Sequence, residues 1–299
     1  MPAPDHGSRR LVNPRGTGQI LAWATMVLAS AVSAPPAMSA PPEAAAADPV
    51  DLRPIFQQGG LPARAQGGRN TCSVFTVVGA IEYALAERQP QGRRLSIEFL
   101  NWASNRTIHQ SQDGAYFSDL WKGFETYGIC AEDEMPYQAE FDRTLRPSPT
   151  ARERAGQARD AGLRLHWIKR WNPQTGLTEQ EFAEIKQTLR RKWPVCGGFR
   201  WPKQERWNDG VLEMAPPEGV RDGHSILLVG YRDEAAQPGG GGFLIRNSGK
   251  GLRDAAMTYE YVRTYMNDAV WIDRAGPAVA APSEGAASDD AAGPPAIGD

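Results

Sequence analysis

The chain has 299 residues, of which 41% are hydrophobic and 23% charged, a balance typical of a soluble globular protein with a core of its own. Its formal net charge of −2 argues against a nucleic-acid-binding protein, which needs a strongly basic face. The three cysteines (Cys72, Cys130 and Cys196) exclude a disulfide-dense scaffold and a CxxC zinc site, and they leave an odd thiol.

The two ends of the chain differ in composition from the middle. Three arginines within the first 19 residues precede an apolar run over 20–34 and then small residues and prolines, which is the order of a secretory signal peptide. The run is shorter than the about 20 residues of a membrane span, so an uncleaved anchor is the less favoured alternative. Residues 275–299 lack aromatic residues and cations, which predicts a disordered tail. We therefore expect a signal peptide over 1–47, one folded domain over 48–274 and the tail.

Helical patterns dominate the first half of that domain. Residues 71–86 are apolar on nearly every side and predict a buried central helix, because a surface helix keeps one polar face. Further helices are expected over 96–104, over 118–127 with Ser118 as N-cap and Gly128 as C-cap, and from the capping-box patterns that begin at Thr150 and Thr178.

Strand patterns dominate the second half. Apolar runs predict strands over 195–201, 224–231, 243–247 and 270–273, and alternation around His166 predicts one more. Because helices come first and strands mostly later, this order predicts an α+β protein with a helical lobe and a sheet lobe.

Two residues combine reactivity with a position at the end of a predicted core element. Cys72 opens the buried helix, whose N-terminal N–H groups and partial positive charge stabilise a thiolate. His224 begins an apolar strand, where a titratable ring can act at a cleft. The alternatives are an inert buried cysteine and a capped core histidine. No metal and no other cofactor is expected, since the chain has no HExxH motif and few histidines.

Several stretches of the sequence resemble stretches of the papain-like cysteine peptidases, and they occur in the same order along the chain. Cys72, His224 and Asn247 follow one another at a spacing close to that of the family, and Gln66 precedes the cysteine by six residues. The matching stretches are QGGRNTC, VFTVVGAIE, RLSIEFLNWAS, DGAYFSDLWKGFETYGI, EDEMPY, DGHSILLVGY and FLIRNSGKG, which together span about residues 50–272. The sequence departs from the family pattern where Arg69 replaces a cysteine and where Ser73 and Gly249 each replace a tryptophan.

The resemblance implies a papain-like two-lobed fold, with a helical lobe, an antiparallel sheet or barrel-like lobe, and an active-site cleft between them. It implies that Cys72 is the nucleophile, that His224 is the acid and base, and that Asn247 orients the imidazole. The remaining implied roles are an oxyanion donor at Gln66, substrate-backbone contacts at Gly114 and Ala115, and a pocket for the residue two before the cut at Tyr116 and Phe117.

The function expected from the resemblance is that of an exported bacterial thiol endopeptidase, secreted or periplasmic. It would hydrolyse peptide or protein substrates through a Cys72 acyl-thioenzyme, as a monomer without a stable membrane anchor after signal cleavage. Only about twenty residues separate the signal peptide from Gln66, so no inhibitory pro-region is expected. Two alternatives remain, a Cys–His–Asn acyltransferase or transpeptidase and a non-catalytic papain-like peptide-binding protein. The resemblance places Cys130 and Cys196 in different lobes, which predicts two buried free thiols.

Overall fold

A computed structural model of the protein describes residues 48–86, 92–250 and 253–274. The predicted signal peptide over 1–47 and the predicted tail over 275–299 lie outside the described residues. Within the described part of the chain, no helix has the length and apolar character that a membrane crossing requires.

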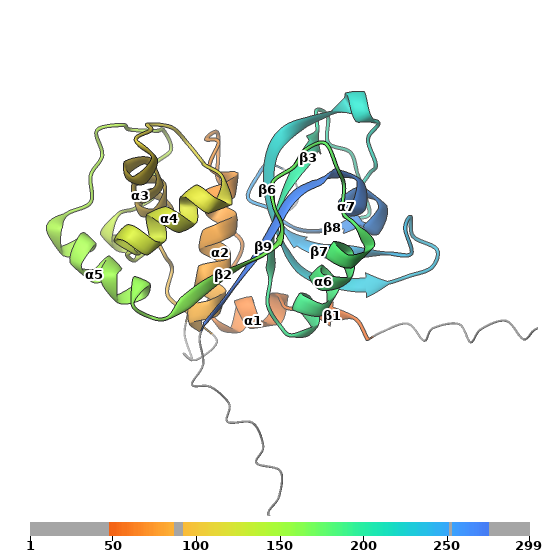
Figure 1. The fold of residues 1–299 in the computed structure, drawn as a ribbon, viewed down its shortest axis with the longest axis horizontal. Coiled ribbons are helices and arrows are strands. Elements are labelled where there is room, and N and C mark those ends of the chain that lie inside the picture. The colour runs from red at the N-terminus through yellow and green to blue at the C-terminus, as the bar shows by residue number, and fades with distance from the viewer. Residues whose placement is uncertain (1–47, 87–91, 251–252, 275–299) are drawn as a thin grey trace, which may run out of the picture. The chain divides into compact units, whose positions relative to one another are not determined.

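Nine strands of the described residues form one sheet, which makes up one lobe (Figure 1). They are β1 (Val50–Asp51), β2 (Leu163–Lys169), β3 (Val195–Pro202), β4 (Trp207–Asn208), β5 (Val211–Leu212), β6 (Val220–Asp233), β7 (Gly241–Arg246), β8 (Asp254–Thr258) and β9 (Met266–Arg274). Their order is β2-β9-β3-β6-β7-β8-β5-β4, with β1 paired to β6. Neighbouring strands run antiparallel except β5 and β8, so the expectation of an antiparallel lobe needs this one correction.

The other lobe is helical. It contains α2 (Cys72–Ala86), α3 (Ile97–Ile108), α4 (Phe117–Tyr127) and α5 (Pro149–Arg159), whereas α1 (Arg53–Gln58), α6 (Glu179–Arg190) and α7 (Tyr259–Tyr265) lie on the side of the sheet (Figure 1). The two-lobed α+β architecture expected from the sequence is therefore confirmed.

Helix α2 joins the two lobes. It packs against α3 and α4 on one side and against β3, β6 and β9 on the other, which explains why it is apolar all round. Val74, Val77, Val78 and Ile81 are all fully buried, and each such side chain contributes about 1.5–3 kcal/mol through burial. The β-branched residues, which weaken the helix locally, are thus compensated by packing from both lobes.

Two predicted N-cap residues are wrong by two positions each. Tyr116 and not Ser118 is the N-cap residue of α4, and its side chain makes no capping hydrogen bond. Helix α5 is capped by Ser148 and not by Thr150, because the Ser148 side chain accepts a hydrogen bond from the Ala151 N–H and a proline follows at the first helical position.

The other predicted caps agree with the structure. The Thr178 side chain accepts a hydrogen bond from the Glu181 N–H, and the Glu181 carboxylate accepts one from the Thr178 N–H. The predicted capping box of α6 is therefore confirmed. Gly128 ends α4 with φ of 74°. A side chain there would collide with the Ala155 carbonyl oxygen, so the position requires glycine.

All three cysteines are buried and free, which confirms the prediction of two buried free thiols at Cys130 and Cys196. Cys130 packs within the helical lobe against Phe99, whereas Cys196 lies on β3. Burial raises the pKa of the Cys130 thiol to about 12 and raises that of Cys196 as well. These two thiols are therefore inert, which leaves Cys72 as the reactive candidate.

Candidate active site

A cleft of about 800 Å³ lies between residues of the two lobes. One wall comes from the N-terminus of α2 and from the segment that leads into α4, and the other comes from β3, β6 and β9. Cys72 and His224 are on opposite walls, so the fold brings together two residues that are 152 positions apart in the sequence.

Cys72 and His224 both line the cleft, and each residue lies close enough to the other to shift its pKa. Cys72 is the first residue of α2 and is 8% exposed, so its sulfur lies at a helix N-terminus with limited contact with solvent. Its Sγ is 3.7 Å from the carbonyl oxygen of Gly223, directly before the histidine. Thiol and ring therefore lie where a proton can pass between them.

Asn247 holds the imidazole from its other side. Its Oδ1 lies 3.0 Å from His224 Nε2 and also accepts a hydrogen bond of 2.8 Å from the Gly249 N–H. Asn247 follows β7 and is 1% exposed, so solvent cannot compete for this contact. Nδ1 of the ring is the nitrogen left for the thiol.

The two reactive groups shift each other's protonation. Burial opposes ionisation of Cys72, but the hydrogen bond and the charge of His224 outweigh it, and the pKa of the thiol is lowered. Burial likewise disfavours the charged imidazole, but Cys72 and Asn247 outweigh it and raise the pKa of His224. Both shifts favour a thiolate paired with an imidazolium.

Trp201 covers the imidazole, although the sequence analysis did not identify it. Its ring centroid lies 4.5 Å from that of His224, and the residue is 3% exposed. Gly249, which stands where the family pattern has a tryptophan, has no side chain, and a Cβ there would be 3.2 Å from His224 Cε1. An indole from β3 thus supplies an aromatic cover for the ring in a chain that lacks tryptophan at position 249.

Gln66 lies next to the cleft with both ends of its amide engaged. Its Nε2 donates a 2.7 Å hydrogen bond to the Arg69 carbonyl, and its Oε1 accepts one of 2.8 Å from Ser248 Oγ. Its backbone N–H donates to the Ser248 carbonyl at 2.8 Å. The amide is therefore fixed beside the segment that leads to Cys72, and one of its two N–H groups donates to the Arg69 carbonyl.

The four expected substrate-contact residues all line the cleft, at the segment before α4 and at its first residue. Gly114 has φ of 72°, and a Cβ there would lie 2.6 Å from the Asn70 carbonyl oxygen, so the position requires glycine. The Ala115 N–H donates a 3.2 Å hydrogen bond to Ser73 Oγ. Tyr116 is 56% exposed whereas Phe117 is 2% exposed, so only the tyrosine presents a large surface to a ligand.

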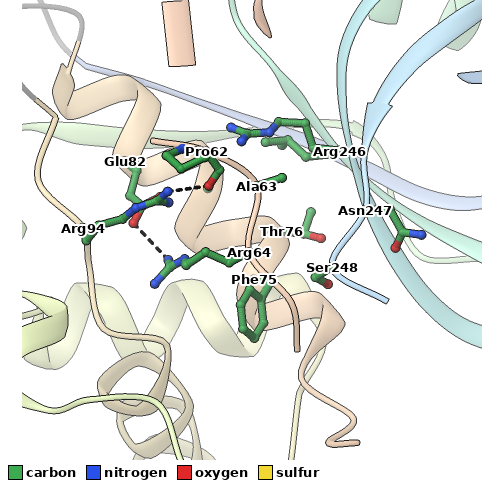
Figure 2. Close-up of a pocket in the computed structure, with 12 residues that line it drawn as sticks. Pro62, Ala63, Arg64, Phe75, Thr76, Glu82, Arg94, Arg246, Asn247 and Ser248 are labelled. Atoms are coloured by element: carbon green, nitrogen blue, oxygen red, sulfur yellow. Dashed lines mark hydrogen bonds and ion pairs between the residues drawn. The ribbon is translucent and has the colours of Figure 1, made fainter. Parts of the chain in front are cut away.

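A second cavity, of about 40 Å³, lies beside α2 (Figure 2). Figure 2 shows Glu82 of α2 facing two arginines, with Arg64 Nη2 at 2.9 Å and Arg94 Nη1 at 3.3 Å from its carboxylate. This volume accommodates a few water molecules and no peptide. The Arg64–Glu82 ion pair holds the segment before Gln66 against α2 and therefore helps to position Gln66.

The described residues contain no group of three or more His, Cys, Asp or Glu side chains able to hold a metal ion. The cleft and its wall supply a thiol, an imidazole and an amide, the side chains of Cys72, His224 and Asn247.

The comparisons with known proteins agree with this geometry. A family model described as papain family cysteine protease matches residues 47–255. Xylellain, a cysteine protease from Xylella fastidiosa, is 23% identical, with a TM-score of 0.60 over 78% of this chain and 88% of its own. A clostridial cysteine protease, Cwp84, is 17% identical, with a TM-score of 0.55 over 76% of this chain and 59% of its own.

Digestive procathepsin L 3 of Tenebrio molitor larval midgut is 17% identical, with a TM-score of 0.52 over 79% of this chain and 71% of its own. A search of curated protein sequences gives no match. At these identities the solved structures establish a shared fold, and the family model establishes a shared sequence pattern over most of the described residues.

Proposed function

Since the chain belongs to the papain family of cysteine proteases and is a cysteine-type peptidase, we propose that it is an exported endopeptidase whose nucleophile is Cys72. The observation that carries the proposal is that Cys72 and His224 line one cleft and shift each other's pKa, while Asn247 Oδ1 lies 3.0 Å from His224 Nε2. The expected substrates are peptides or proteins, because the family is one of peptidases.

The reaction proceeds in two stages. His224 Nδ1 takes the Cys72 proton, and the thiolate attacks the carbonyl carbon of the substrate to form a tetrahedral intermediate. Its collapse breaks the C–N bond, and the imidazolium gives its proton to the leaving amine. The thioester that remains is hydrolysed by a water molecule that passes its proton to His224, which releases the acid and regenerates the thiol.

The remaining residues stabilise charge and position. Asn247 accepts the Nε2–H hydrogen bond, which keeps Nδ1 toward the sulfur in both stages. The backbone N–H of Cys72 and the Gln66 amide are the proposed oxyanion donors. The Gln66 Nε2 donates one of its two N–H groups to the Arg69 carbonyl in the free protein, which leaves the second N–H for this role.

Export is proposed from the order of the first 47 residues: basic, then apolar, then small. The mature protein would be a monomer that begins near residue 48, carries the tail over 275–299 and resides in the periplasm or the medium. Expression of the full chain in a bacterial host, fractionation and intact mass of the exported protein test this. Recovery of the full-length chain in the membrane or cytoplasm alone would contradict it.

The pH dependence of Cys72 alkylation tests the catalytic proposal. Because the pKa of Cys72 is lowered, iodoacetamide should modify it at least about tenfold faster than glutathione at pH 6. The His224→Ala variant should lose this advantage, since burial alone raises the pKa of the thiol. Rates are measured by peptide mass spectrometry across pH 4–10.

The other two cysteines are internal controls in the same experiment. Cys130 and Cys196 are buried with raised pKa values, so they should remain unmodified in the native protein. Under denaturing, non-reducing conditions all three cysteines should be alkylated. A Cys72 rate equal to that of glutathione at every pH would refute the thiolate–imidazolium pair.

A further inference from the structure

Apart from the Cys72–His224 pair, the charged side chains that line the cleft are all acidic. Three of its lining residues are aspartates (Asp113, Asp119 and Asp268), and no lysine or arginine is among the described residues that line it. A cleft lined with carboxylates raises the local concentration of cations and disfavours anionic substrates. The three carboxylates, however, differ in how far their charge is already compensated.

Two of the carboxylates already have cationic partners. Asp113 Oδ1 lies 2.7 Å from Nη2 of the buried Arg69, so its charge is compensated inside the protein. Asp119 lies 3.7 Å from the ammonium group of Lys122, on the same exposed side of α4. Asp268, in contrast, is in no ion pair within the part of the chain that the structure describes.

Asp268 is buried at the base of the cleft. It is 4% exposed, it lies on β9 opposite Gly198 of β3, and both residues line the cleft. A Cβ at Gly198 would be 2.1 Å from Asp268 Oδ1, so the glycine provides the space that the carboxylate occupies. A carboxylate that is buried in such a place without an ion-pair partner is costly to ionise, and a cation that approaches it offsets that cost.

Two exposed aromatic rings lie near this carboxylate. Tyr116 and Trp171 are 56% and 48% exposed, and their ring centroids are 5.5 Å apart, so they meet across the cleft. Trp171 is tied to the strand of Asp268, since the next residue, Asn172, donates a 2.9 Å hydrogen bond to the Asn267 carbonyl. Two aromatic rings and a buried carboxylate in one cleft suit a long aliphatic side chain that ends in a cation.

We propose that Asp268 is a specificity-determining residue and that the cleft selects substrates in which a lysine or arginine side chain ends at this carboxylate. The aliphatic part of that side chain lies against Tyr116 and Trp171. The proposal deepens the peptidase function and rests on it, because selection is read out as hydrolysis through Cys72.

The selection should depend on pH. Burial raises the pKa of Asp268 to about 7, although the Gly198 backbone N–H and Lys169 act in the opposite direction. The carboxylate is therefore mostly neutral below pH 6 and mostly charged above pH 8, and its attraction for a cation grows across that interval. The other titratable groups around it are Lys169 at the end of β2, Cys196 on β3, and Cys72, His224, Asp113 and Asp119 along the cleft.

The test uses pairs of peptides that differ only in arginine or citrulline, which is a neutral analogue of similar shape, at successive positions around the cleaved bond. The readout is the ratio of kcat/KM values for the two members of a pair. The effect of Cys72 and His224 ionisation on kcat/KM is the same for both peptides and cancels in this ratio. For the full chain, one position should show a ratio of about 30 at pH 8.5, a value expected for a charge-assisted hydrogen bond, and a ratio near 1 at pH 5.5.

The isosteric variant Asp268→Asn should reduce the ratio to between about 1 and 3 at both pH values. The matched variant Asp119→Asn removes a carboxylate from the same cleft and should keep most of the ratio. If both variants abolish the ratio equally, the selection arises from the overall field, and the role of Asp268 is refuted.

The outcomes separate this inference from the function on which it rests. Hydrolysis of the peptides with a ratio near 1 at every position and pH overturns the inference and leaves the peptidase intact. Absence of hydrolysis for every peptide, with slow alkylation of Cys72, overturns the proposed function itself. The pH dependence of the wild-type ratio needs no variant, so it decides the matter even if Asp268→Asn fails to fold.

Discussion

Replacing Cys72 by alanine is expected to lower kcat/KM for peptide hydrolysis by about 10⁵-fold, the scale on which loss of a nucleophile acts. The substitution removes one sulfur atom at the first residue of α2, and the valines and the isoleucine that anchor this helix remain in place. The fold and the cleft should therefore persist while the thioester can no longer form. Hydrolysis of a fluorogenic peptide library and the melting temperature are measured together.

The matched control is Cys130→Ala, the same substitution at a buried free thiol in the helical lobe. This residue does not line the cleft, so hydrolysis should stay within about threefold of the wild type, apart from any loss of stability. If Cys72→Ala retains more than about 1% of the activity, the nucleophile is another group and the proposed mechanism is wrong.

Replacing Arg69 by methionine is expected to lower the free energy of unfolding by about 3–5 kcal/mol, because it leaves a buried carboxylate without its cation. Arg69 is 5% exposed and its guanidinium pairs with Glu98, which is itself 5% exposed, and with Asp113. It also donates a 3.0 Å hydrogen bond to the Gln138 carbonyl. Urea denaturation of the two proteins gives the difference directly.

Two further variants separate this network from ordinary surface charge. Arg53→Met removes an arginine that pairs with Asp51 on the surface, and it should cost less than about 1 kcal/mol. The double variant Arg69→Met/Glu98→Gln should recover part of the loss, since the stranded charge is gone. Equal costs for the two arginine variants would show that the buried network contributes no more than an exposed ion pair.

Patterns that are local in the sequence account for most of the fold. The run of apolar residues in α2, the capping box at Thr178 and the apolar strand patterns of β3 and β6 each determine their own element, and the structure agrees with them. Element starts were less predictable. Both Ser118 and Thr150 are good cap residues, but the chain begins these helices earlier, where packing and a proline favour the turn.

The residues of the candidate site also fall into two groups, those that the sequence could identify and those that it could not. Cys72, His224 and Asn247 could be identified because their order and neighbouring residues resemble a family, and the structure brings them together in the cleft and its wall. Trp201 and Asp268 could not, because their roles depend on strand pairing. The contact of Trp201 with His224 and the pairing of Asp268 with Gly198 join segments that are far apart in the chain. Asp268 also lies outside the strand predicted over 270–273, because β9 begins earlier, at Met266.

All three cysteines lie in the described part of the chain and none is cross-linked. Where the family pattern has a cysteine, Arg69 instead ties its loop to α3 and to the segment of Asp113 through charge. A reductant that protects the Cys72 thiol from oxidation therefore breaks no disulfide bond that stabilises the fold. Reducing conditions that keep the proposed nucleophile active therefore also leave the protein folded, and the protein can satisfy both needs in the same environment.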